Sequence, residues 1–244
     1  MRDPVAETRE IRQDPHPSQE LLHREEIESR WEAAPSVGLL IALQLLVTVL
    51  SREHGWRLWK LPWWGWLLSV ALEAVLLVPL SLSWPRRRLQ QLGLRREAVI
   101  SLLALTSVAN GLLVVMLIGS LVTGSERSGG RLLLEAIVVW ATNVIAFGLW
   151  FWAFDRGGPV RRLEPDPPPP DFQFPQLENP PLAEPGWRPH LIDYVYVSFT
   201  NSIAFSPTDV MPLTRWAKVL MLAESGLSAV TILLVAARAV NIFR

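Results

Sequence analysis

The sequence predicts an all-α integral membrane protein with five transmembrane helices and a re-entrant helical hairpin before the last of them. Three observations predict this fold class. Half of the 244 residues are hydrophobic, twelve are tryptophan and only 19% are charged, a composition that is rare in soluble chains of this length. Five segments are apolar over enough residues to cross a hydrocarbon core about 30 Å thick. A further apolar stretch ends too early to cross and leads into a polar turn.

The chain divides into four parts. Residues 1–35 form a polar N-terminal tail, and within it residues 18–31 place apolar side chains at helical spacing, which fits either an interfacial helix or a solvated tail. Residues 36–154 form a four-helix transmembrane region, residues 155–190 a proline-rich connection, and residues 191–244 a re-entrant helix and loop followed by the final transmembrane helix. The chain has no cysteine, which excludes disulfides and thiolate chemistry.

The five expected spans are long enough to cross as helices at about 1.5 Å per residue. Two of them carry an internal glutamate, which is Glu73 in the second span and Glu224 in the last. Tryptophans cluster before the second span, as expected of side chains that anchor a helix at the membrane interface. The spans are residues 33–51, 61–84, 98–125, 136–154 and 219–237.

The connection between the fourth span and the re-entrant stretch contains eleven prolines within residues 155–190. Such a segment cannot form a regular helix and favours extended conformations on the membrane surface. Two roles fit it. It is either a structural linker laid over the helix ends, which is the more common role of such segments, or a docking site for a protein partner that reads proline-rich sequence.

The stretch from Tyr194 to Thr208 is uncharged, but as a helix it reaches only about 22 Å, which is too short to span. Ser206 and Pro207 end any helix there, and the chain should continue as extended backbone. Extended backbone at membrane depth needs partners from water or protein, so the loop should line an aqueous cavity or be buried in a bundle. The pore-loop candidates are Asn201, Ser206, Pro207, Thr208 and Asp209.

The C-terminal segment resembles the pore helix, filter and inner helix of potassium channels. In this resemblance Asp209 matches the acidic end of the filter motif, Pro212 and Thr214 match the turn after it, and Gly226 matches the inner-helix glycine. The resemblance implies a pore-helix-like hairpin. The filter glycines are missing, because residues 204–208 read Ala-Phe-Ser-Pro-Thr, so potassium selectivity is not implied.

The chain also resembles a family of bacterial inner-membrane proteins of unknown function. The residues that carry this resemblance are Asp193 to Phe199, which read DxxYxSF, the Thr208-Asp209 turn, and Ala239 to Ile242, which read AVNI. It implies several spanning helices and placement in the cell membrane of a bacterium, and it implies no particular activity.

Polar residues inside the expected spans are the most informative single positions, because a charged side chain there costs several kcal/mol and normally faces protein or water. Ser228, Thr231 and Arg238 fall within about 40° of Glu224 on one helical face. This stripe fits a water-filled path or a polar seam between helices, and Glu73 carries the same ambiguity. Asn110 and Asn143 are expected to be hydrogen-bond partners between helices.

The sequence gives little support for an enzymatic function. The four histidines lie outside the apolar segments, and no metalloprotease, nucleophile-elbow or phosphate-loop motif is present. We expect no catalytic residues, no metal, no cofactor and no nucleic-acid partner. His190 and Asp193 could hold a metal by spacing, but two ligands rarely suffice.

The arginines between the second and third spans, at positions 86, 87, 88, 95 and 96, favour a cytoplasmic location for that loop. Counting helices from it places the N-terminus and the proline-rich connection inside, so the hairpin would enter from the cytoplasm. The expected function is a channel-like conduit for ions or small solutes, built as a homo-oligomer in the lipid bilayer. The alternative is a non-conducting scaffold that binds a partner through the proline-rich connection.

Overall fold

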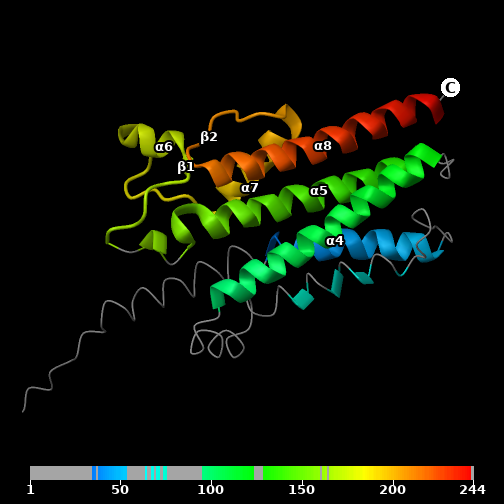
Figure 1. Cartoon of the computed structure of the whole chain (residues 1–244), viewed down its shortest axis with the longest axis horizontal. Helices are drawn as coiled ribbons and strands as arrows, with labels where there is room; N and C mark the ends of the chain where they lie inside the picture. Colours follow the sequence, from blue (N-terminus) through cyan, green and yellow to red (C-terminus); the bar gives the residue numbers. More distant parts are fainter. Residues whose placement is uncertain are drawn as a thin grey trace, which may run out of the picture.

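The computed structural model shows an elongated, mostly helical bundle closed at one end by irregular chain (Figure 1). The long helices are α4 (Arg95–Thr123), α5 (Gly129–Phe154) and α8 (Arg215–Ile242), and α7 (Leu191–Ala204) is shorter. A further helix precedes them at residues 38–53. The structure describes residues 35–36, 38–53, 64, 67–68, 70–71, 74–75, 95–123, 129–159, 161–163 and 165–242.

Helix α5 is the centre of the bundle, because α4, α7 and α8 all pack against it. It is rich in Leu, Val, Trp and Phe over more than six turns, and most of its side chains are buried. The helix ends where Arg156, Gly157 and Gly158 take positive φ values of 53°, 78° and 105°. Glycine adopts such values at little cost, so the two glycines allow the chain to turn out of the helix into the connection.

The proline-rich connection folds against the end of the bundle. Two of its aromatic side chains, Phe172 and Phe174, are almost fully buried in the core with Phe151, Leu191 and Tyr194. Its short elements are 3-10 turns at Asp155–Gly157, Arg161–Leu163 and Pro180–Leu182, strand β1 (Phe172–Gln173) and helix α6 (Pro175–Glu178). The connection therefore packs against the helix ends.

The chain then enters the bundle along α7 and comes back to the same end. Along α7, Tyr194 contacts Asp155 at the end of α5, whereas Asn201 contacts Glu224 well inside α8. After Ala204 the chain returns, and β2 (Met211–Pro212) pairs antiparallel with β1 in the connection. Helix α8 starts next to it and runs parallel to α7 (Figure 1). We call residues 191–214, which comprise α7 and the irregular arm that returns from it to β2, the hairpin.

The two-residue ladder between β1 and β2 is a departure from the all-helical prediction. Phe172 lies opposite Pro212 and Gln173 opposite Met211, and the Leu213 amide donates to the Asp171 carbonyl at 2.8 Å. This ladder joins the connection to the returning arm of the hairpin, a contact that no periodicity in the sequence indicates.

Among the residues that the structure describes, two helical segments are long and apolar enough to cross a membrane, Leu133–Gly157 and Arg215–Leu233. They coincide with the fourth and fifth expected spans. The third expected span falls largely within α4, which is 29 residues long and contains the apolar segment Leu103–Gly119. The N-terminal tail and most of the second span, with Glu73, lie outside the described residues.

Candidate functional site

Glu224 is the one acidic residue of α8, and its side chain has no exposed surface. It lies nine residues after the start of the helix at Arg215, which is about 14 Å along the axis. Both carboxyl oxygens have partners on α7. The Ser198 hydroxyl contacts Oε1, and the Asn201 amide donates to Oε2 at 2.8 Å. The carboxyl group is therefore enclosed between two parallel helices.

Helix α7 presents a polar stripe to this site because its buried and exposed residues alternate with helical period. Ser198, Asn201 and Ser202 are all buried, at no more than 1% exposure. The opposite face carries large apolar side chains that are at least 44% exposed, namely Ile192, Tyr196, Phe199 and Ile203. The inward face of the hairpin is thus hydrogen-bonding and its outward face is apolar.

Helix α5 supplies the floor of the site through its backbone. The Ser198 hydroxyl lies 2.7 Å from the Val144 carbonyl. One turn further along α5, Gly148 lets α7 approach, since a Cβ at Gly148 would stand only 2.9 Å from the Cα of Val195. Real Cβ atoms essentially never come that close to backbone. The missing side chain at Gly148 therefore sets the distance at which Ser198 meets α5.

The amide of Asn201 organises the α7–α8 contact. It donates to the Met221 carbonyl at 3.0 Å as well as to Glu224, and its side-chain oxygen accepts from the Ser225 hydroxyl at 3.0 Å. All its hydrogen-bonding groups thus point at α8. Asn201 is the one pore-loop candidate from the sequence that the structure brings to Glu224.

A second set of buried polar residues lies one turn beyond Glu224 along α8. Ser228 accepts from the Asn143 amide at 3.5 Å, and the Asn143 side-chain oxygen accepts from the Asn110 amide at 3.3 Å. The predicted Asn110–Asn143 pairing between helices is confirmed. Thr231, also buried, donates to the Leu227 carbonyl within α8. We call the set of eight residues the polar seam: Asn110, Asn143, Ser198, Asn201, Glu224, Ser225, Ser228 and Thr231.

The other pore-loop candidates lie apart from the polar seam. Ser206, Pro207, Thr208 and Asp209 are exposed on the arm that returns from α7. Their side chains bond locally, with Thr208 donating to Asp209 at 2.8 Å and Ser206 to the Ala204 carbonyl at 3.2 Å. Phe205 ends α7 with a left-handed φ of 55°. Within this single chain the loop is a surface turn, where the sequence predicted buried or water-lined backbone.

Two further candidates, Glu73 and Arg238, fall wholly or partly outside the described residues. Glu73 lies outside the described residues. Arg238 belongs to α8, but its side chain is outside the description. It follows Glu224 by 14 residues, which is about 21 Å along the helix. This separation is too great for an ion pair with Glu224.

A second polar cluster, at the end of the bundle, was missed by the sequence analysis. Asp155 accepts from the Asp171 amide at 2.8 Å and from the Tyr194 hydroxyl at 2.5 Å, and it lies 4.0 Å from the Arg162 guanidinium. Arg162 also donates to Tyr194 at 2.7 Å. Burial raises the pKa of the Tyr194 phenol well above its ordinary value, so Tyr194 acts as a neutral donor.

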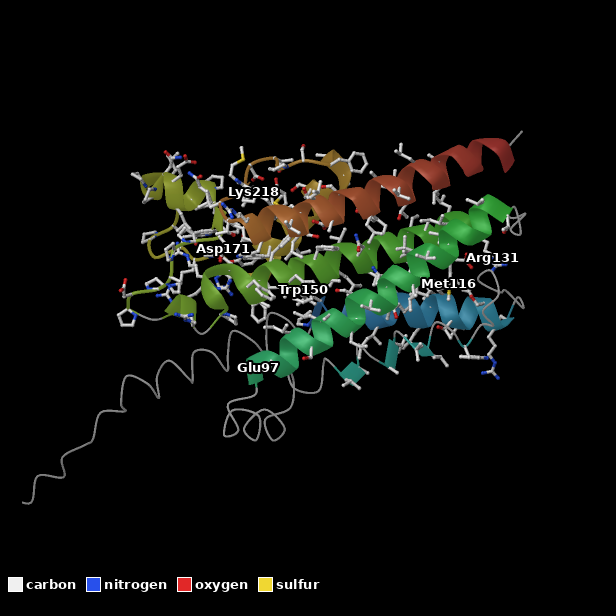
Figure 2. The ribbon with its side chains drawn as sticks, in the orientation of Figure 1. Glu97, Met116, Arg131, Trp150, Asp171 and Lys218 are labelled. Carbon is white, nitrogen blue, oxygen red and sulfur yellow. The ribbon has the colours of Figure 1, made fainter. Side chains whose placement is uncertain are left out.

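Asp171 extends this cluster to the hairpin and α8. Its carboxylate accepts from the Arg156 amide at 2.9 Å and from the Trp216 indole at 2.7 Å. Figure 2 shows Asp171 at the junction of the connection and the helix ends. We call Asp155, Arg162, Asp171, Tyr194 and Trp216 the end cluster. The only sequence signal for it was an aspartate directly after an aromatic-rich span.

The remaining charged candidates have structural partners. The backbone amide of His190 donates to the Asp193 carboxylate at 2.7 Å, which caps the first turn of α7. Glu135, a buried residue that the sequence analysis did not single out, pairs with Arg131 at 3.0 Å. In the part of the chain that the structure describes, no three His, Cys, Asp or Glu residues gather as a metal site would require.

Comparison of the chain with protein-family models, with curated proteins and with solved structures finds no match. The features that bear on function are therefore the polar seam, the hairpin and the end cluster.

Proposed function

We propose that the chain is a multi-pass protein of the cell membrane with five spanning helices, in which α7 and the returning loop form a re-entrant hairpin. Three features support this. Segments of α5 and α8 are long and apolar enough to cross, α7 is too short at about 21 Å, and the chain returns to the end from which it entered. The outward apolar face of α7 suits contact with lipid or with another protein surface.

The orientation that we propose places the connection, and with it the N-terminus, in the cytoplasm. The start of α4 carries Arg95 and Arg96, and the connection and the start of α8 add Arg156, Arg161, Arg162, Arg188, Arg215 and Lys218. Figure 2 shows Asp171 and Lys218 near one end of the bundle and Arg131 at the other. Short loops rich in arginine and lysine remain on the cytoplasmic side.

Cysteine labelling tests the hairpin and its orientation together, and the cysteine-free chain makes the assay clean. We expect cysteines placed at Ser206 and Thr208 to react with membrane-impermeant maleimide only from the cytoplasmic side of oriented vesicles. A cysteine at Asp166, exposed in the connection, is the control for that side. Reaction from the opposite side would mean that α7 crosses the membrane, and the re-entrant assignment would then be wrong.

The function that the geometry supports best is a channel-like conduit for ions or small solutes. One observation carries this proposal: Glu224 is fully buried among Ser198, Asn201 and Ser225, and the polar seam continues from it to Asn143 and Asn110. A carboxyl group in the interior of an apolar bundle is costly and usually marks a path for ions or protons. The missing filter glycines argue against a potassium-type selectivity.

Unsatisfied polar atoms next to the polar seam add support. Thr106 Oγ1, Thr142 Oγ1 and the Asn110 side-chain oxygen are buried and have no hydrogen-bond partner among the described residues. Thr106 lies one turn before Asn110 on α4, so the two share a face. Buried polar groups normally have partners, and water in a conduit would satisfy these three.

A homo-oligomer is part of the proposal. The tip of the hairpin, Phe205 to Asp209, is irregular backbone on the surface of the single chain. In a bilayer such backbone is tolerated only against protein or a water-filled cavity. Neighbouring copies around a common axis would provide this cover, which one short re-entrant helix cannot provide for itself.

Flux through purified protein in liposomes tests the conduit. We expect the wild type to release a gradient of protons, a monovalent cation or a small neutral solute, and Glu224→Gln to lose or alter that release. Glutamine keeps the shape and can keep the hydrogen bonds to Ser198 and Asn201 while removing the titratable group. The matched control on the same helix is Gly226→Ala, because a Cβ there meets nothing within 4 Å.

The competing function is a non-conducting scaffold, and one observation favours it. The outer part of the connection projects from the bundle, with Leu182 88% exposed beside prolines 180 and 181. A protein partner could bind this surface. Wild-type liposomes that hold every gradient over the tested pH range would support the scaffold and contradict the conduit.

A further inference from the structure

Around Glu224 the acceptor oxygens in hydrogen-bond contact outnumber the available donor protons by one. Ser198 Oγ contacts two oxygens, the Val144 carbonyl and Glu224 Oε1. A serine hydroxyl carries a single proton and accepts with its lone pairs. It can therefore donate to one of these oxygens only. The contact with the other oxygen requires a proton from elsewhere.

The neighbouring donors are fully used. The two amide protons of Asn201 go to the Met221 carbonyl and to Glu224 Oε2, and the Ser225 hydroxyl donates to Asn201 itself. The Val144 carbonyl has no proton to give. Among the described residues, the one group left to supply the missing proton is the carboxyl group of Glu224, which in its protonated form is a donor.

We propose that Glu224 is a proton-binding site, and that in this arrangement of the helices it is a neutral carboxylic acid. Its Oε1 hydroxyl donates to Ser198 Oγ, Ser198 donates to the Val144 carbonyl, and Oε2 accepts from Asn201. Every donor and acceptor of the group then has a partner. The ligand of the site is a proton, which the carboxylate binds at Oε1.

The charges on the surrounding helices agree with a neutral group. The titratable residues of α4 are Arg95, Arg96 and Glu97 in its first turn, and those of α5 are Arg131 and Glu135, which pair with each other. Those of α7 are Asp193, Tyr194 and Tyr196, and those of α8 besides Glu224 are Arg215, Lys218 and Arg238. Glu224 forms no salt bridge with any side chain that the structure describes, and at such a position a bare carboxylate is costly.

A metal cation fits the site less well than a proton. A cation requires oxygen ligands directed at it, and Asn201 turns its amide nitrogen, not its oxygen, toward Glu224. The N–H groups would repel the cation. The same orientation suits the carbonyl oxygen of a protonated carboxyl group.

This inference rests on the proposed function for the placement of α8 in the membrane, but its test does not depend on transport. Infrared spectra of the full chain in hydrated lipid films, near neutral pH, distinguish the C=O stretch of a protonated acid from carboxylate bands. We expect the wild-type minus Glu224→Gln difference spectrum to contain an acid band. The same substitution at the paired residue, Glu135→Gln, should remove carboxylate bands instead.

Two further measurements assign the band to this pocket. In Asn201→Leu the acid carbonyl loses the hydrogen bond to Oε2, so the band should move to higher wavenumber while remaining present. Replacing choline in the buffer by sodium should leave the wild-type band unchanged. Loss of carboxylate bands alone in Glu224→Gln, an unshifted band in Asn201→Leu, or disappearance of the band in sodium would each overturn the proposal.

The outcomes separate the proton site from the conduit. An acid band in protein that shows no flux supports the proton site and contradicts the conduit. Flux in protein whose Glu224 shows only carboxylate bands contradicts the proton site and leaves the conduit standing.

Discussion

Replacing Asp155 by alanine is expected to lower the free energy of unfolding by about 3–5 kcal/mol, the cost of breaking a buried charge pair by removing one partner. Asp155 is 1% exposed, accepts hydrogen bonds from the Asp171 amide and the Tyr194 hydroxyl, and forms an ion pair with the Arg162 guanidinium. Its removal leaves a donor of the connection and a donor of the hairpin without their acceptor. The attachment of both to α5 would weaken together.

Denaturant titration in detergent, followed by tryptophan fluorescence, measures this loss. Asp155→Asn should cost less, since the amide oxygen can still accept from Asp171 although the charge near Arg162 is gone. The matched control is Asp166→Ala, an exposed aspartate of the same connection, which should stay within about 0.5 kcal/mol of wild type. Equal effects at Asp155 and Asp166 would contradict the structural role of the end cluster.

The helical core was predictable because it depends on local pattern. The fourth and fifth expected spans coincide with helices that can cross a membrane, since a run of about twenty apolar residues is its own signal. The Asn110–Asn143 pair and the buried face of Glu224, Ser228 and Thr231 followed from the cost of polar groups among apolar ones and from the 100° helical period. The first prediction uses polar residues that are rare within apolar segments, and the second uses the spacing of polar residues along one helix.

The contacts that assemble the hairpin were not predictable in the same way. The β1–β2 ladder joins Phe172 to Pro212, and Asp171 meets Trp216, across about 40 residues with no periodic signal. The enclosing role of Ser198 depends on a backbone carbonyl of α5, which no sequence motif marks. The short uncharged stretch and its proline predicted a pore loop at Ser206 through Asp209, whereas in the single chain the polar contacts to Glu224 come from Ser198 and Asn201 on α7.

Gly148 is another position that the sequence did not single out, although it controls the approach of two helices. A Cβ there would lie 2.9 Å from the Cα and 3.2 Å from the amide nitrogen of Val195. Because these are backbone atoms, a rotamer change cannot relieve the contact. Helix α7 as a whole would have to move away from α5.

Gly148→Ala is therefore expected to destabilise the protein by about 1–3 kcal/mol, the cost of overpacking a well-packed interface, and Gly148→Val by more. For this result, the steric cost of the added Cβ has to exceed the gain in helix propensity of up to about 1 kcal/mol that comes from replacing glycine by alanine. Gly111→Ala and Gly226→Ala isolate that gain, because a Cβ at either glycine meets nothing within 4 Å. Both controls should be neutral or stabilising in the same denaturant titration.

The displacement should also reach Glu224. Ser198 follows Val195 by three residues on the same helix, so moving α7 outward stretches the contacts of Ser198 to Val144 and to Glu224 together. In Gly148→Val we therefore expect the acid band assigned to Glu224 to shift or to be replaced by carboxylate bands, as water reaches the group. Gly226→Ala should leave the band in place. A Gly148→Val protein with wild-type stability and an unchanged band would show that α7 does not depend on this close approach for its position over the carboxyl group.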